Sequence, residues 1–427
     1  MKEISEQIKQ KAEYCLNCKN PLCIKGCPLG NNIPEFIKKV KEENYKEAFD
    51  ILSETTIMQP ICGIICPQEK QCQGSCVRGI KEEPVQIGDL EAFVGNLALE
   101  NNWYKCVGVG VLDDPEKVNK RVAIIGGGPA GIVCSAYLAK KGYDVTIYEK
   151  HNKLGGLLVH GIPEFRLNRK LIEKWINQIL ELGIKVEYEK ELGKDLSLEK
   201  LQEKYDAIFI SIGANKSIRL GIDGENLKGV YGANELLERN NHPDYKGKIV
   251  AVIGGGNVAL DSSRTIKKLG AKKVYIIYRR AEKQMPAEKK EIEDAKKEGI
   301  EFLFQNNIVK IIGKKEVSAV ELIKTELVKK EGEDREIPID IEKSNYELEV
   351  DYVIKAIGSK PEKNEIFVDI ELDSKGYIRI DENFNTSNKK IFAGGDITGT
   401  KSTVAYAAKT GREAADAIDD FLKEKNS

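Results

Sequence analysis

The chain has 427 residues, enough for about three domains of roughly 150 residues each. Lysine and arginine together number 67 against 68 aspartates and glutamates, and the resulting net charge of -1 excludes a global field that would attract nucleic acid or an anionic membrane. The N-terminal run MKEISEQIKQKAEYC has no apolar core of a secretory signal, so we expect a cytoplasmic protein with reduced thiols. The uncharged run from Val122 to Ala139 is interrupted by Gly126, Gly127, Gly128 and Pro129, which favours a strand, a tight loop and a helix over a membrane span.

The N-terminal segment, residues 1–112, is rich in cysteine, and eight of the ten cysteines lie within the first 76 residues. Apolar residues recur there at spacings of three and four, which predicts two short helices, from Ile33 to Val40 and from Tyr45 to Leu52. We therefore expect a small helical domain that ends near residue 112.

The eight cysteines form two groups, each with a Cys-Pro pair. The first group is Cys15, Cys18, Cys23 and Cys27, and the second is Cys62, Cys66, Cys72 and Cys76. Closely spaced thiolates of this kind resemble the ferredoxin pattern. In that pattern three cysteines of a group bind one cluster, and the last cysteine of the group binds the second cluster. Two interleaved iron–sulfur clusters are the favoured interpretation, and two structural zinc sites or disulfides are the alternatives.

A glycine loop follows the apolar strand pattern from Lys120 to Ile125. Gly126, Gly128 and Gly131 have the spacing of a dinucleotide-binding turn, in which the first makes the turn, the second admits a pyrophosphate and the third packs helix on strand. Glu149 ends the next predicted strand, where an acid accepts a hydrogen bond from a ribose 2′-hydroxyl. This context predicts a nucleotide site.

A second glycine loop repeats the pattern at Gly254, Gly256 and Ala259. Arg279 and Arg280 stand where Glu149 stood in the first repeat, and their guanidinium groups suit a 2′-phosphate. The second site therefore favours NADP over NAD, unless one arginine only solvates the end of the strand.

Two similar strand patterns, at 206–213 and 351–358, flank this second loop and indicate an inserted domain. The chain after it would return to the first sheet through the KKIFAGGD segment at 389–396 and end in a helix from about Thr403 to Leu422. The predicted fold is α/β, with two doubly wound Rossmann-like domains after the helical cysteine domain. The expected boundaries are 1–112, 113–215, 216–358 and 359–427.

These motifs resemble a known family over nearly the whole chain. The eight-cysteine pattern, GGGPAG at 126–131, GGLLVHGIPEFRL at 155–167, GGGNVALD at 254–261, YRRAEKQMPA at 278–287 and GGD at 394–396 are similar to the small (β) subunit of NADPH-dependent glutamate synthase. Relatives include the N-terminal half of dihydropyrimidine dehydrogenase and the large subunit of a bifurcating NADH-dependent ferredoxin:NADP oxidoreductase.

The resemblance implies FAD in the first Rossmann-like domain and NADPH, with NADH less favoured, in the inserted one. Asp396 would lie near the FAD ribityl-pyrophosphate, and the helix after Thr403 would point at the flavin ring. The candidate cofactor-binding residues in the first domain are Gly126, Gly128, Pro129, Ala130, Gly131, Glu149, Lys150, Gly156, Leu157, Arg166, Gly213, Gly395, Asp396 and Thr403. Those in the inserted domain are Gly254, Gly256, Asn257, Val258, Ala259, Arg279, Arg280 and Gly358.

The resemblance also implies the ligands of two 4Fe-4S clusters. Cys15, Cys18, Cys23 and Cys76 would hold one cluster, and Cys27, Cys66 and Cys72 would hold the other. The eighth ligand in relatives is Gln or Glu one helix later, and Glu91 fits because Ile87, Leu90, Val94 and Leu97 predict a helix there. Cys62 is the alternative eighth ligand.

The expected function is electron transfer between NADPH, FAD, the two clusters and a partner redox protein docking near residues 1–112. No side chain is assigned a catalytic role, because the cofactors carry the chemistry. The competing hypothesis is an electron-relay subunit without turnover of its own, in a hydrogenase, CO or formate dehydrogenase, or bifurcating complex. A zinc-stabilised NADP-binding regulator is a third possibility, and it would be colourless.

Overall fold

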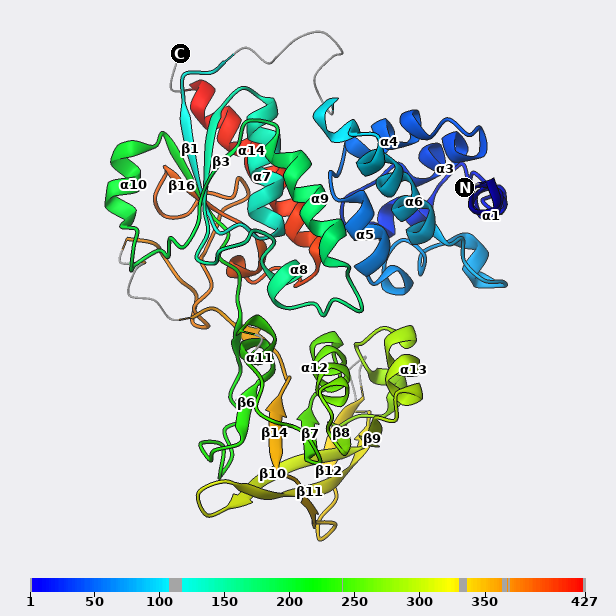
Figure 1. The fold of residues 1–427 in the computed structure, drawn as a ribbon, viewed down its shortest axis with the longest axis vertical. Helices are drawn as coiled ribbons and strands as arrows, with labels where there is room; N and C mark the ends of the chain where they lie inside the picture. The colour runs from blue at the N-terminus through cyan, green and yellow to red at the C-terminus, as the bar shows by residue number, and fades with distance from the viewer. Residues whose placement is uncertain are drawn as a thin grey trace. The chain divides into compact units, whose positions relative to one another are not determined.

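The computed structural model describes residues 2–106, 117–239, 241–329, 336–362, 367 and 369–424 (Figure 1). The chain divides into two compact units. Unit 1 comprises Met1–Val159, Glu164–Ala214 and Lys363–Ser427, and unit 2 comprises His160–Pro163 and Asn215–Glu362. The boundary predicted at residue 112 lies outside the described residues.

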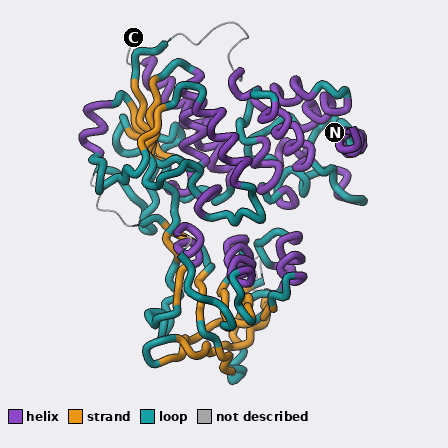
Figure 2. The backbone as a smooth tube through the Cα atoms, in the orientation of Figure 1, coloured by secondary structure: helices purple, strands orange, loops and turns teal. Residues whose placement is uncertain are grey.

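The N-terminal part of unit 1 is helical, as Figure 2 shows. Its helices are α1 (Lys2–Glu13), α2 (Leu22–Gly26), α3 (Ile33–Lys41), α4 (Tyr45–Ser53), α5 (Gln59–Ile65) and α6 (Ile87–Glu100), with short 3₁₀ turns at Gln68–Lys70, Val77–Ile80 and Trp103–Cys106. The helices predicted from apolar periodicity are confirmed as α3, α4 and α6. Phe36, Val40, Phe49 and Leu52 are fully buried because that periodicity turns one face of each helix inward.

The rest of unit 1 is built on a parallel sheet in the order β16-β4-β1-β2-β3. The strands are β1 (Arg121–Ile125), β2 (Asp144–Tyr148), β3 (Lys185–Glu187), β4 (Ala207–Ile210) and β16 (Ile391–Ala393). The helices are α7 (Pro129–Lys140), α8 (Leu157–His160), α9 (Arg169–Leu180), α10 (Leu198–Lys204) and α14 (Val404–Glu424), with a 3₁₀ turn at Gly395–Thr398. The predicted return of the C-terminal segment to the first sheet is confirmed by the pairing of β16 with β4.

Helices cover both faces of this sheet, and Figure 1 shows α7, α9 and α14 on one side and α10 on the other. Ala123 and Ile125 of β1 pack with Leu198 and Leu201 of α10. Strand β1 lies between β2 and β4, so the strand order runs in one direction from β1 and then in the other. The carboxyl end of β1 is therefore the switch point, where sheets of this kind bind ligands.

Unit 2 contains a second parallel sheet in the order β6-β14-β7-β8-β9. Its strands are β6 (Val230–Gly232), β7 (Ile249–Ile253), β8 (Lys273–Tyr278), β9 (Glu301–Phe304) and β14 (Tyr352–Lys355), and its helices are α11 (Ala233–Arg239), α12 (Asn257–Lys268) and α13 (Lys289–Lys297), with a 3₁₀ turn at Glu282–Gln284. The arrangement repeats that of the first sheet, with β7 at the switch point.

An antiparallel sheet that the sequence did not predict lies within unit 2. It consists of β10 (Asn306–Gly313), β11 (Val317–Val328), β12 (Ile337–Asp340) and β13 (Tyr346–Glu349), and a separate small pair joins β5 (Lys216–Ser217) to β15 (Ser359–Lys360). Ile308, Ile311, Val320 and Leu322 of this sheet pack with Val353 of the parallel sheet. None of the helices in the described ranges combines the length and apolar character that crossing a bilayer requires.

Candidate cofactor sites

The first glycine loop joins β1 to α7. Gly126 has a φ of +100°, in the region that favours glycine, and its N–H donates to the Tyr148 carbonyl at 2.8 Å. A Cβ on Gly131 would lie 2.0 Å from the Gly126 carbonyl oxygen, whereas one on Gly128 would meet only the Cα of Gly156, at 3.8 Å. The loop is therefore tightly packed at Gly131 and has free space beside Gly128. This space suits a pyrophosphate at the start of α7.

Glu149 is 3% exposed and bonds the loop directly. Its Oε2 accepts from the Gly127 N–H and its Oε1 from the His151 N–H, both at 2.8 Å. Each carboxylate oxygen can accept a second hydrogen bond, so a ribose hydroxyl can still be bound. Glu149 thus has a structural role, holding the loop, that its sequence position alone did not indicate.

The GGD turn after β16 packs against the first turn of α7. The Gly395 N–H donates to the Thr410 hydroxyl at 2.8 Å, and a Cβ on Gly395 would lie 3.1 Å from that of Ala130. Burial raises the pKa of Asp396 to about 6. The structure therefore brings the predicted residues of the α7 loop and the GGD turn together at one edge of the sheet.

The other candidates of this site occupy several segments. Thr403 precedes α14 and accepts from the Tyr406 N–H, and Gly213 follows β4. Leu157 begins α8, Lys150 is exposed, and Arg166 is half-buried. The roles of these five residues in binding FAD remain predictions.

The second glycine loop, in unit 2, has the same form. Gly254 has a φ of +141°, and a Cβ on Gly256 would meet only Pro286, at 3.9 Å. Asn257, at the start of α12, exchanges hydrogen bonds with Glu288 through its side chain. Val258 is partly exposed and Ala259 buried in the same turn, while Gly358 accepts from the Ile218 N–H at 3.0 Å.

The two arginines after β8 are anchored through their backbones. The Arg279 carbonyl accepts from the Thr325 hydroxyl at 2.8 Å, and the Arg280 carbonyl accepts from the Gln305 N–H at 3.1 Å. Arg279 is exposed, and the buried Nε of Arg280 has no hydrogen-bond partner among the described residues. An unsatisfied donor of this kind at the end of the strand suits an anionic ligand such as a 2′-phosphate.

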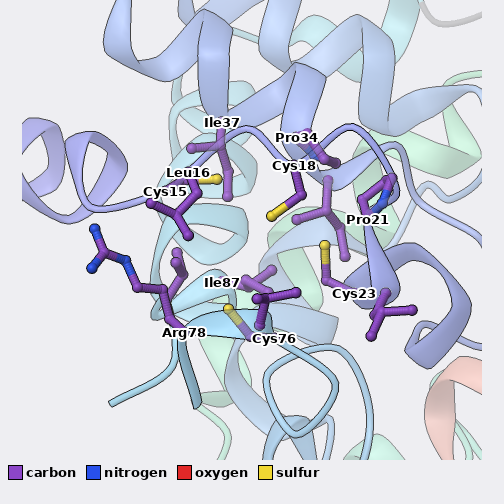
Figure 3. Close-up of a pocket in the computed structure, with 14 residues that line it drawn as sticks. Cys15, Leu16, Cys18, Pro21, Cys23, Pro34, Ile37, Cys76, Arg78 and Ile87 are labelled. Atoms are coloured by element: carbon purple, nitrogen blue, oxygen red, sulfur yellow. The ribbon is translucent and has the colours of Figure 1, made fainter. Parts of the chain in front are cut away.

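Cysteines of both sequence groups meet around one pocket in the helical part of unit 1. Cys15, Cys18, Cys23 and Cys76 line it, together with Ile33, Ile37 and Ile87. Figure 3 shows the four sulfur atoms directed into a common space. Burial, followed by the neighbouring thiols, raises the pKa of Cys23 to about 11, and a cation in the pocket would favour the thiolate form.

The second set lies in a more buried environment. Cys66 and Cys72 are buried, and Glu91 is only 6% exposed. The pKa of Cys27 is raised to about 11 by burial first and then by Glu91 and Cys66, and that of Glu91 to about 8 by burial. Burial and mutual repulsion disfavour the anionic forms of these thiols and of Glu91. A cationic iron–sulfur core beside them would favour those anionic forms.

Cys62 shares this environment with Glu91. It is 1% exposed. A hydrogen bond with the Cys66 side chain lowers its pKa, but burial, followed by Glu91, Cys27 and Cys72, raises the pKa overall. The eighth ligand therefore stays a choice between Glu91 and Cys62.

Within the described ranges, no three His, Cys, Asp or Glu side chains form a group that could hold a single metal ion. A mononuclear zinc site needs four donors about 2 Å from one centre, whereas a cluster spreads its ligands over several iron atoms. The cluster assignment rests instead on the meeting of cysteines from both sequence groups around one pocket.

Sequence reasoning missed the polar residues that orient the predicted ones. Asn31 donates to Glu91, Thr410 accepts from Gly395, and Ser211 bonds the Gly126 carbonyl through its hydroxyl at 3.0 Å. Thr410 carried a signal, as a buried polar residue among the alanines of α14.

Comparison with known proteins now identifies the family. A family model described as pyridine nucleotide-disulphide oxidoreductase matches residues 120–411, and one described as dihydropyrimidine dehydrogenase domain II, 4Fe-4S cluster, matches residues 2–103. The chain belongs to the pyridine nucleotide-disulphide oxidoreductase family. It is an NAD(P)H-dependent FAD oxidoreductase with an N-terminal 4Fe-4S domain.

Curated relatives of this oxidoreductase confirm the resemblance drawn from its motifs. The NADPH glutamate synthase small chain of Escherichia coli is 35% identical, over 98% of this chain and 92% of its own length. The beta subunit of the NADP(+)-dependent formate dehydrogenase of Moorella thermoacetica is 33% identical, over 94% of this chain and 60% of its own.

Solved structures support the α/β fold of this oxidoreductase. FprA of Mycobacterium tuberculosis, in complex with NADPH, is 21% identical and superimposes with a TM-score of 0.64, over 72% of this chain and 85% of its own. Thioredoxin reductase of T. acidophilum gives a TM-score of 0.53 at 23% identity, over 72% of this chain and all of its own.

Proposed function

We propose that this oxidoreductase moves electrons between NADPH and a partner redox protein through FAD and two 4Fe-4S clusters, as a glutamate synthase small subunit-like component. Bound FAD would link the two-electron chemistry of a nicotinamide to the one-electron chemistry of the clusters. The partner would dock near residues 1–112, where Leu16 and Leu22 beside the thiol pocket are 54% and 44% exposed.

The observation that carries this proposal is the direct attachment of the N-terminal helical part of unit 1 to the first dinucleotide fold. The Trp175 indole donates to the Ile57 carbonyl at 2.7 Å, and the Gln178 amide donates to the Leu99 carbonyl at 2.8 Å. Both donors lie on α9 and are buried. Such contacts would hold the flavin and cluster sites at a fixed separation.

The chain's own residues would bind and orient the groups. The loop from Gly126 to Gly131, Glu149 and Asp396 would hold FAD, and the loop from Gly254 to Ala259 with Arg279 and Arg280 would hold NADPH. Cys15, Cys18, Cys23 and Cys76 would hold one cluster, and Cys27, Cys66, Cys72 and Glu91 the other. We retain the division into domains 1–112, 113–215, 216–358 and 359–427, and a cytoplasmic location, as parts of this proposal.

The test is reduction of a tetrazolium dye by NADPH with the anaerobically purified chain. Dye reduction should require FAD and survive loss of a cluster, because a dye can take electrons from flavin directly. An inactive, fully loaded chain would favour the alternative of a relay subunit without turnover. Conversion of glutamine and 2-oxoglutarate by this chain with NADPH alone would contradict the need for a partner.

Nucleotide preference provides a separate prediction. Replacing Arg279 and Arg280 by glutamine should weaken NADPH binding by about 10- to 100-fold, the loss of about 1.5–3 kcal/mol in charged hydrogen bonds to a phosphate. NADH binding should stay nearly unchanged, because NADH carries no 2′-phosphate.

The dissociation constants are measured by fluorescence titration, with Lys297→Gln as the control because Lys297 is an exposed lysine of α13. Tighter binding of NADH than of NADPH by the unmodified chain would refute the role of the arginines.

A further inference from the structure

A chain of hydrogen bonds leads from α14, in the dinucleotide fold, to the carboxylate of Glu91. Its last step is the Asn31 side-chain amide, which donates from Nδ2 to Glu91 Oε1 at 3.3 Å. Asn31 is 2% exposed and Glu91 6% exposed. Among the described side chains, Asn31 is the only hydrogen-bond partner of this carboxylate, and it uses one of the two oxygens.

Thr55 holds the Asn31 amide from its oxygen side. The Thr55 hydroxyl donates to Asn31 Oδ1 at 2.7 Å, nearer than its other acceptor, the Leu52 carbonyl, at 3.3 Å. A carboxylate that binds iron is ionised and can only accept, so the NH₂ of Asn31 must face Glu91 and the Asn31 oxygen must face Thr55. Without the Thr55 hydroxyl, the Asn31 oxygen loses the contact that holds the amide in this position.

Arg412 connects this pair to the dinucleotide fold. It lies on α14, is 16% exposed at its side chain, and donates through Nη1 to the carbonyls of Thr55 and Leu29. The same helix packs closely on α7, since a Cβ on Gly411 would lie 2.2 Å from the Ala130 carbonyl oxygen. The segments that carry Asn31 and Thr55 are thus fixed to the helix that follows the GGD turn.

We propose that Asn31, oriented by Thr55, is a positioning residue that presents the Glu91 carboxylate to the second cluster and raises the reduction potential of that cluster. This inference rests on the proposed assignment of Glu91 as a ligand. A hydrogen bond to a ligand oxygen draws negative charge away from the metal, and this favours the reduced state. The Asn31 bond occupies Oε1 and leaves Oε2 for iron.

The experiment is a redox titration of each cluster, followed by electron paramagnetic resonance, on FAD-loaded full-length variants. Asn31→Ala and Thr55→Val should lower the potential of one cluster and leave the other unchanged. Thr55→Ser keeps the hydroxyl and should keep both potentials. Asn44→Ala is the matched control, because it removes an asparagine that caps α4 without contact to Glu91. If Asn31→Ala does not fold, the Thr55 pair decides the question.

Two further variants separate failure of this inference from failure of the ligand assignment. Glu91→Ala should remove or convert the same cluster that Asn31→Ala shifts, while Cys62→Ser should retain both clusters. If Glu91→Ala retains both and Cys62→Ser loses one, Cys62 is the ligand and the inference falls with the assignment. If Glu91→Ala loses a cluster but Asn31→Ala and Thr55→Val leave every potential unchanged, only the positioning role is overturned.

Discussion

Replacing Cys76 by serine is expected to remove one whole cluster, lowering the iron content from about eight to about four atoms per chain. Cys76 is distant in sequence from Cys15, Cys18 and Cys23, yet all four line one pocket. A serine hydroxyl is a poorer ligand for iron than a thiolate, so the remaining three cysteines should not retain a complete cluster. Iron analysis and the loss of one paramagnetic signal measure the effect.

The control for this prediction is Cys134→Ala. Cys134 is a fully buried thiol of α7, outside both cysteine groups, and its replacement should leave the iron content unchanged. If Cys76→Ser instead removes the paramagnetic signal of the cluster that Cys27, Cys66 and Cys72 hold, the ligands are not interleaved as proposed.

The second large effect is expected from a pair of glycines in the first loop. Gly128→Ala should fold normally but lose FAD, because its Cβ meets nothing in the protein closer than 3.8 Å and would occupy the space for the pyrophosphate. Gly131→Ala should destabilise the chain itself by about 1–3 kcal/mol or more, since its Cβ would lie 2.0 Å from a backbone oxygen. Thermal unfolding and flavin absorbance distinguish the two variants.

Gly256→Ala in the second loop completes this comparison. It has similar free space, 3.9 Å from Pro286, and should weaken NADPH binding while the FAD content stays at the level of the unmodified chain. Full FAD content in Gly128→Ala, or FAD loss in Gly256→Ala, would mean that the two loops are assigned to the wrong nucleotides.

Periodicity and loop spacing predicted much of this fold because both are local properties. Phe36 and Phe49 are buried on helices whose apolar spacing is visible in the sequence, and β1 and β7 lead directly into their glycine loops. The antiparallel strands β10 to β13 were missed, since no motif marks them and their pairing depends on the neighbouring parallel sheet.

The polar supports of the candidate sites could not be predicted because they join residues far apart in the chain. Arg412 bonds the carbonyl of Thr55 across 357 positions, and Asn31 bonds Glu91 across 60. The Asn31-Asn32 pair before a helix is also typical of an ordinary turn. The sequence alone could not decide between Glu91 and Cys62, since both are buried beside the same thiols.

The most direct test of the central claim is the iron, zinc and FAD content of the unmodified chain, purified without oxygen. An electron path through one flavin and two clusters predicts about eight iron atoms and about one FAD per chain, with no zinc. About four iron atoms together with stoichiometric zinc, or the absence of flavin, would contradict it.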